Sequence, residues 1–136
     1  MQKIILSLTL LIIASSLLSA AERVVSLSPN LTEIIFDLGR GEMLVGRSSA
    51  CDYPPEVLEV PAVQSGLETN LEQIIALSPQ VLLMGTMGQT KEQVNALEAA
   101  GIKVVVSEAK DIEGVYTAIS MIGALMSIIT SVVSAL

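Results

Sequence analysis

The sequence predicts an α/β fold in which a parallel β-sheet is flanked by helices. Short apolar runs such as Val81–Met84 lack polar alternation, which is typical of strands buried on both faces of a sheet. Segments of about 8 to 12 residues separate these runs and carry apolar residues at helical spacings of three and four. Strands that alternate with helices in this way form right-handed βαβ units, which build a parallel sheet.

The first half of the domain begins with a strand expected over Arg23–Ser28 and a helix from Asn30 to Leu38. Asn30, with Glu33 three residues later, has the pattern of a capping box. Gly39 suits the cap at the far end of this helix. Two short strands are expected next, at 43–46 and 61–64, on either side of a loop over 48–55.

The second half shows further capping signals. Thr69, followed three residues later by Glu72, has the pattern of a second capping box, and Thr90 with Gln93 starts the next helix. Asp111 is expected to cap the last helix. The expected elements are a helix over 71–77, a strand over 81–84, a helix over 90–100, a strand over 102–106 and a helix from 112 onward.

The N-terminus has the pattern of a secretory signal peptide over residues 1–21. Lys3 gives a positive start, Ile4–Leu18 is largely apolar, and Ser19–Ala21 supplies the small residues of a cleavage site. An uncleaved membrane anchor is the alternative, although the apolar run is short for a span of about 20 residues. We therefore expect an exported, soluble and acidic mature protein with one domain over 22–110.

Composition excludes several classes of function. The 136 residues are 51% hydrophobic and 15% charged, which excludes a disordered chain, and the net charge of −7 excludes a nucleic-acid-binding role. The chain has no His, which removes the usual catalytic base and the commonest metal ligand. Its single Cys51 is expected to be a small buried side chain. Glu68 and Glu72 lie on a loop and at a helix start, where acidic side chains are stabilised by the helix dipole, so we do not interpret them as a catalytic pair. Together these observations lead us to expect no enzyme activity, no metal site and no cofactor.

In a parallel sheet, ligands bind beyond the carboxyl ends of the strands. The loops that follow the expected strands are therefore the candidate binding loops. They are 28–30, 48–52, 65–69 and 85–89.

Four segments carry a family resemblance: RVVSLSPNLTE at 23–33, VGRSSACDYPP at 45–55, NLEQIIALSPQVLL at 70–83 and LEAAGIKVVV at 97–106. In this order and spacing they resemble the N-terminal lobe of the periplasmic binding proteins that deliver cobalamin, haem and ferric siderophores to ABC importers. The resemblance extends over residues 23–125. It implies a two-lobed helical-backbone protein, of which this chain supplies one truncated lobe.

The resemblance also implies a function, substrate binding for the import of a metal chelate, and the residues that perform it. The chelate would lie between the lobes, and Glu72 would dock on the ABC permease of the inner membrane. Cobalamin binders carry aromatic residues where this chain has Ala50, Gly66 and Gly85, which argues against cobalamin and leaves haem or a siderophore. The residues of this lobe expected to contact the ligand are Asn30, Ser49, Cys51, Leu67 and Thr86.

The C-terminal segment departs from the family. Residues 111–125 match the start of the inter-lobe linking helix, whereas 126–136 form an apolar tail unlike the family, and 114–136 contain no charged residue. Three interpretations remain: a truncated or frameshifted gene, a single-lobe membrane-tethered module that docks on a permease without binding ligand, and a soluble half-protein that pairs with another chain. The expected location is the periplasm, with membrane contact through 114–136 in the second case.

Overall fold

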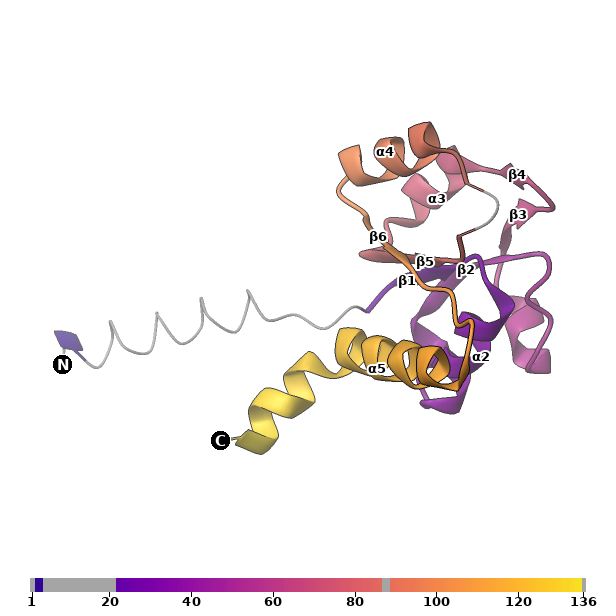
Figure 1. The fold of residues 1–136 in the computed structure, drawn as a ribbon. Coiled ribbons are helices and arrows are strands. Elements are labelled where there is room, and N and C mark those ends of the chain that lie inside the picture. Colours follow the sequence, from indigo (N-terminus) through magenta and orange to yellow (C-terminus); the bar gives the residue numbers. More distant parts are fainter. Residues whose placement is uncertain (1, 4–21, 87–88, 136) are drawn as a thin grey trace.

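The computed structural model describes residues 2–3, 22–86 and 89–135, with side chains described as far as residue 126. The expected signal peptide over 1–21 therefore lies almost wholly outside the described residues. The strands are β1 (Val24–Ser26), β2 (Leu44–Ser48), β3 (Ala62–Ser65), β4 (Glu68–Thr69), β5 (Val81–Met84) and β6 (Lys103–Val106). The helices are α2 (Pro29–Asp37), α3 (Leu71–Leu77), α4 (Lys91–Ala99) and α5 (Ile112–Ala135), with 3-10 turns η1 (Gly41–Met43) and η2 (Pro55–Glu59) (Figure 1).

The strands form one six-stranded sheet in the order β4-β3-β2-β1-β5-β6. All neighbouring pairs are parallel except β3 and β4, so the predicted α/β class is confirmed. The antiparallel strand β4 was not predicted, since the sequence placed 65–69 in a loop. Gly66 makes the extra strand possible, because its φ of +59° allows a tight turn that lets Glu68 pair with Ser65.

Helices cover both faces of the sheet, α3 and α4 on one side and α2 and α5 on the other (Figure 1). Adjacent residues of one strand point to opposite faces, so Val24 and Val25 enter different cores. The first core contains Val24, Leu31, Ile35, Leu44, Cys51, Val57, Val81, Leu83, Ala118, Ile122 and Met126. The second contains Val25, Leu27, Val63, Ile74, Leu82, Met84, Leu97 and Ile102.

The start of α2 corrects the first capping prediction. The helix begins at Pro29, with Ser28 rather than Asn30 as the N-cap residue. Proline suits the first helical position because its φ is already helical and it has no N–H to satisfy. Asn30 is instead exposed within the first turn, and its Oδ1 accepts a hydrogen bond of 2.6 Å from the Ser28 hydroxyl.

The start of α3 corrects the second. Asn70 is the N-cap residue, and its side chain accepts a hydrogen bond of 3.0 Å from the backbone N–H of Gln73. The predicted capping box of Thr69 and Glu72 is therefore wrong, because Thr69 belongs to β4 and lies one residue too early. Glu72 is an exposed first-turn acid. Its carboxylate is therefore not used in a capping box.

The remaining cap predictions are confirmed. Thr90 and Gln93 make both hydrogen bonds of a capping box, and Asp111 Oδ1 accepts a hydrogen bond of 2.8 Å from Gly114 N. Gly39 follows α2 with a φ of +72°, where its N–H donates to Phe36 O. A residue in this left-handed conformation satisfies the last carbonyls of a helix, and glycine adopts it without strain.

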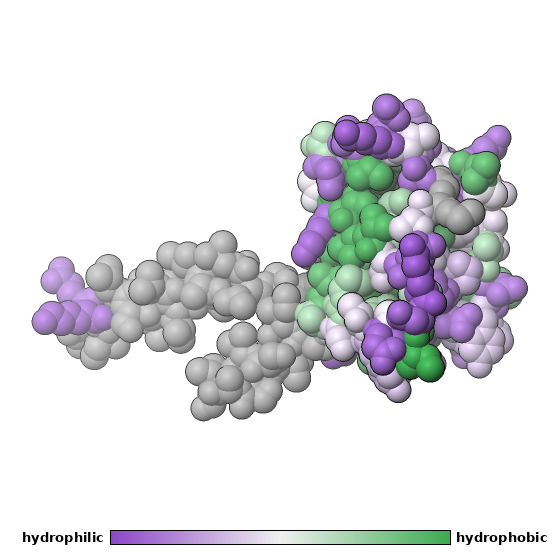
Figure 2. Space-filling view, in the orientation of Figure 1, coloured by the Kyte–Doolittle hydropathy of each residue, from purple (hydrophilic) through white to green (hydrophobic). Residues whose placement is uncertain are grey.

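The far edge of the sheet is formed by β6, which pairs only with β5. Val104 and Val105 are half-buried in this strand, and Val106 at its end is 50% exposed. Figure 2 shows apolar side chains gathered on this side of the molecule. Within the part of the chain that the structure describes, no helix is both long and apolar enough to span a membrane.

Replacing Gly41 with alanine is predicted to destabilise the domain by about 1–3 kcal/mol. The added Cβ would lie 2.6 Å from Phe36 Cδ1, so the packed ring must shift. The measurement is the free energy of unfolding in urea. Gly123→Ala is the control, because a Cβ there meets nothing within 4 Å and the helix should gain about 0.5–1 kcal/mol. An equal effect of the two substitutions would contradict this packing.

Candidate functional site

Four neighbouring parallel strands, β3, β2, β1 and β5, end at one edge of the sheet. The chain builds outward from β1 through β2 and β3 on one side and through β5 and β6 on the other, so the topological switch point lies between β1 and β5. Ligands of open α/β sheets bind at this point. The predicted residues Leu67, Ser49, Asn30 and Thr86 follow these four strands in that order, and all four are exposed.

At the switch point, the loop after β5 approaches the loop after β1 at Gly85, which has no side chain. A Cβ added at Gly85 would lie 3.7 Å from Ser28 Oγ, which is ordinary van der Waals contact, and no other atom lies within 4 Å. Beside it, Ser28 orients the amide of Asn30 by donating to its Oδ1. The edge therefore presents the amide of Asn30 and the hydroxyl of Thr86 on either side of Gly85.

The loop after β2 is joined to β3 through a backbone hydrogen bond. The N–H of Ser49 donates to Gln64 O over 2.7 Å, which fixes Ser49 against the end of β3. Leu67 occupies the tight turn between β3 and β4, where its side chain is 79% exposed. This side chain supplies apolar surface at the edge of the sheet.

Cys51 is placed differently from the other predicted contacts. Its side chain is only 1% exposed, which confirms the expectation of a buried thiol and keeps the sulfur away from the exposed edge. The Thr32 hydroxyl lies 3.2 Å from Cys51 Sγ and 2.8 Å from Ser26 Oγ. Arg47 Nη1 donates to the backbone carbonyl of Cys51 over 3.1 Å. These contacts support the loop that carries Ser49.

Glu72 lies on the exposed first turn of α3, directly after β4. Asn70, the cap of this helix, donates its backbone N–H to Val63 O over 2.8 Å, so the helix start is fixed to β3. Among the described residues, Glu72 forms no ion pair. The Glu72 carboxylate thus stands on a rigid base, exposed to solvent.

Three polar residues near this edge were not predicted to contact one another: Gln64, Thr69 and Gln89. The Thr69 hydroxyl accepts hydrogen bonds from Gln64 Nε2 at 3.0 Å and from Gln89 Nε2 at 2.8 Å. Sequence spacing gives no signal for this cluster, because it depends on the unpredicted strand β4 and joins residues 20 positions apart.

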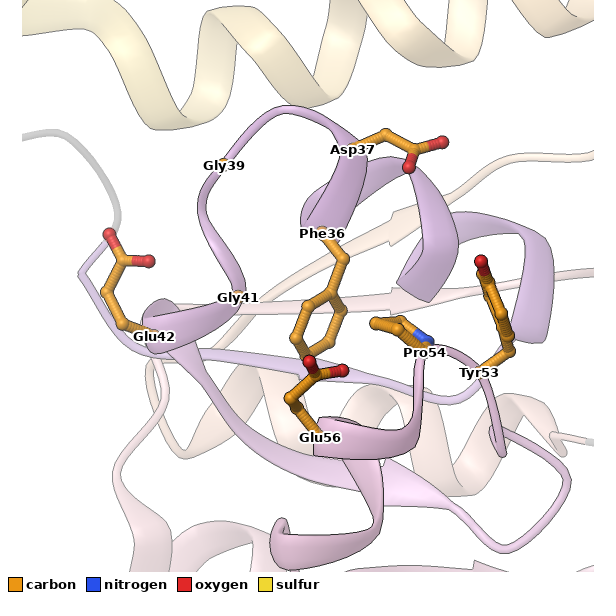
Figure 3. Close-up of a pocket in the computed structure, with 8 residues that line it drawn as sticks. All are labelled: Phe36, Asp37, Gly39, Gly41, Glu42, Tyr53, Pro54 and Glu56. Carbon is orange, nitrogen blue, oxygen red and sulfur yellow. The ribbon is translucent and has the colours of Figure 1, made fainter.

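One hollow lies elsewhere, between the C-terminal part of α2 and the chain leading into η2 (Figure 3). It has a volume of about 480 Å³ and contains none of the predicted ligand contacts. Asp37, Glu42 and Glu56 contribute to its lining, and Figure 3 shows the Glu56 carboxylate beside Phe36. Such a rim disfavours an anionic chelate by charge repulsion. In residues 22–86 and 89–126, no group of His, Cys, Asp and Glu is arranged to hold a metal ion.

Comparison with known proteins agrees with this topology. The family model for periplasmic binding proteins matches residues 24–127. The chain belongs to this family. As a periplasmic binding protein it is 41% identical over 102 residues to the vitamin B12-binding protein of Salmonella paratyphi A, a match that covers 75% of the chain and 38% of that protein. The corresponding protein of Vibrio vulnificus is 34% identical over 115 residues, covering 85% and 42%.

Solved structures of this family superpose on the same region. The periplasmic vitamin B12 binding protein of Vibrio cholerae gives a TM-score of 0.72 at 30% identity, covering 79% of this chain and 42% of that one. A periplasmic heme binding protein from Pseudomonas aeruginosa gives 0.72 at 26% identity, covering 76% and 37%. The chain thus spans about 40% of the length of these relatives, in agreement with a single lobe. These relatives are named as binding proteins, not as enzymes.

Replacing Asn70 with alanine should destabilise the domain by about 1 kcal/mol, because the N-cap bond to Gln73 is lost. Glu72→Ala should cost only about 0.3 kcal/mol, the value of an exposed acid near a helix N-terminus. Urea unfolding of both variants measures the difference. Equal costs would show that Glu72 takes part in capping after all.

Proposed function

We propose that this chain binds a metal chelate at the carboxyl edge of its sheet and acts as the substrate-binding component of an ABC importer. The observation that carries the proposal is the convergence of Asn30, Ser49, Leu67 and Thr86, all exposed, on the edge that contains the switch point. Membership of the periplasmic binding protein family supports it. Such a role involves no catalytic step, because capture and release are equilibria.

The chemistry of the edge suits a ligand with an apolar body and polar margins. Leu67 offers apolar surface, whereas Asn30, Ser49 and Thr86 offer an amide and two hydroxyls as hydrogen-bonding groups. Cys51 contributes by supporting the loop after β2, since its thiol is buried. One lobe covers one side of the ligand, so binding should be weaker than in a site that buries most of its ligand.

Small residues in the candidate binding loops indicate which class of chelate the chain binds. Ala50, Gly66 and Gly85 supply no aromatic ring for stacking, which favours haem or a ferric siderophore over cobalamin. The φ of +59° at Gly66 reinforces this view, because a bulky residue would strain the turn. Relatives of this chain are named for vitamin B12 and for heme, so both ligands belong in the test.

Docking is assigned to Glu72. An exposed carboxylate at the rim of an interface mainly sets orientation and encounter rate with a basic partner. The partner would be the ABC permease of the inner membrane, approached from the periplasm after export by the signal peptide over 1–21. Glu72 is available for this contact because Asn70, and not Thr69 with Glu72, caps α3.

A second candidate function is a membrane-tethered lobe that docks on the permease without carrying ligand. The absence of charge over 114–136 favours it, together with exposed apolar residues on the described part of α5 such as Val115 and Tyr116. Ligand titration separates the two functions.

The chain is titrated with haemin, a ferric hydroxamate siderophore and cyanocobalamin, and binding is measured by absorbance. Either haemin or the siderophore should bind saturably. Leu67→Asp should weaken that binding about fivefold through the lost apolar contact. Leu58→Asp is the matched control, because Leu58 is also exposed, at 58%, but lies in η2 away from the edge. No saturable binding at about 10 μM, a weak affinity even for half of a site, would exclude ligand capture and favour the tethered module.

Reversal of charge at the docking residue should weaken association with the permease in nanodiscs about tenfold, mainly through the association rate. The variant is Glu72→Lys, and the measurement is surface plasmon resonance at two salt concentrations. Glu92→Lys is the control, since Glu92 occupies the corresponding first-turn position of α4. Chelate binding should be unchanged in both variants, and equal loss of permease binding in both would refute a specific role for Glu72.

A further inference from the structure

The two segments that carry Leu67 and Thr86 are connected through one hydroxyl. Thr69, at the end of β4, accepts a hydrogen bond from Gln64 on β3 and another from Gln89, which lies five residues beyond β5. The first bond, of 3.0 Å, spans the strands on either side of the Leu67 turn. The second, of 2.8 Å, ties β4 to the chain that follows Thr86.

Burial makes these bonds structurally significant. Gln64 is 7% exposed, and both Thr69 and Gln89 are half-buried. Within the described part of the chain, the buried Oε1 of Gln89 has no hydrogen-bond partner, so this amide is held through its Nε2 bond to Thr69. Losing the partner of a buried amide costs more than losing an exposed hydrogen bond.

Among the residues that the structure describes, no backbone hydrogen bond joins the two segments directly. In the sheet order, β4 and β3 are separated from β5 by β2 and β1. The hydroxyl of Thr69 therefore bridges segments that the sheet itself leaves three strands apart, β3 from β5. A fixed geometry of this kind pre-organises binding loops and reduces the entropy lost on binding.

We propose that Thr69 is a positioning residue whose hydroxyl holds the Leu67 turn and the chain after β5 in a fixed relation at the ligand edge. The consequence for ligand affinity rests on the proposed function, whereas the coupling of the two segments does not. Thr69 does not need to touch the ligand. It acts through Gln64 and Gln89.

The test replaces Thr69 with valine, which keeps the shape and removes the hydroxyl, and with serine, which keeps the hydroxyl. The full chain is expressed with its own N-terminus and studied after any processing. Two hydrogen-bonded amides report on the segments: that of Asn70, bonded to Val63 O, and that of Thr90, bonded to Gln93 Oε1. In Thr69→Val their hydrogen exchange without ligand, followed by NMR, should become about tenfold faster, the factor set by one hydrogen bond. Thr69→Ser should restore slow exchange. Thr117→Val is the control, because the Thr117 hydroxyl bonds only within α5, to Glu113 O.

Haemin binding is then measured on the same proteins. Thr69→Val should bind about fivefold more weakly at a temperature well below its own melting temperature, because binding must then also order the turn. Unchanged exchange in Thr69→Val, faster exchange over the whole domain, or a serine variant that behaves like valine would each overturn the proposal. Faster exchange at the two sites with unchanged haemin affinity would overturn the positioning role.

Two further arms keep the outcomes distinct. If the wild-type chain binds none of the chelates, the proposed function fails, and the exchange data alone decide whether Thr69 couples the segments. If Thr69→Val does not fold, Gln89→Ala removes one of the two bonds. Exchange should then rise at Thr90 and stay slow at Asn70, and a rise at neither would refute the coupling.

Discussion

The structure depends on the complete burial of β1 between β2 and β5. Its three residues, Val24, Val25 and Ser26, are each 1% exposed or less, and they send side chains into the cores on both faces. Because a strand buried in this way must pair on both sides, the chain adds strands outward in two directions from it. The same requirement creates the reversal of strand order at which the candidate binding residues converge.

Burial of β1 brings a polar group into the interior, and the neighbouring residues satisfy it. The Ser26 hydroxyl meets the Thr32 hydroxyl of α2, which also lies 3.0 Å from the carbonyl of Ser28 and next to the Cys51 sulfur. A buried hydroxyl without a partner would be costly, so this cluster fixes the helix start and the loop after β2 relative to β1. The positions of the loops at the edge are therefore fixed by buried hydrogen bonds as well as by contacts at the surface.

The sequence predicted the features that local chemistry determines. Apolar runs located the main strands, and Thr90 with Gln93 located a helix start, because both signals act within a few residues. The predictions at Asn30 and at Thr69 with Glu72 failed since two or more residues near each helix start could cap it. Pro29 decided the first case, and the pairing of Thr69 in β4 decided the second. The edge itself was predictable from topology, whereas the contact of Gln89 with Thr69 required the assembled sheet.

The open edge of β6 bears on how this chain behaves at high concentration. A strand with a free side presents unpaired N–H and C=O groups, and runs of valine there favour addition of a strand from another molecule. Lys103, exposed at the beginning of β6, places a charge against such stacking, whereas Val106 at the other end leaves it unopposed. Association between molecules through this strand edge should thus depend on a single lysine at one end and an uncovered valine at the other.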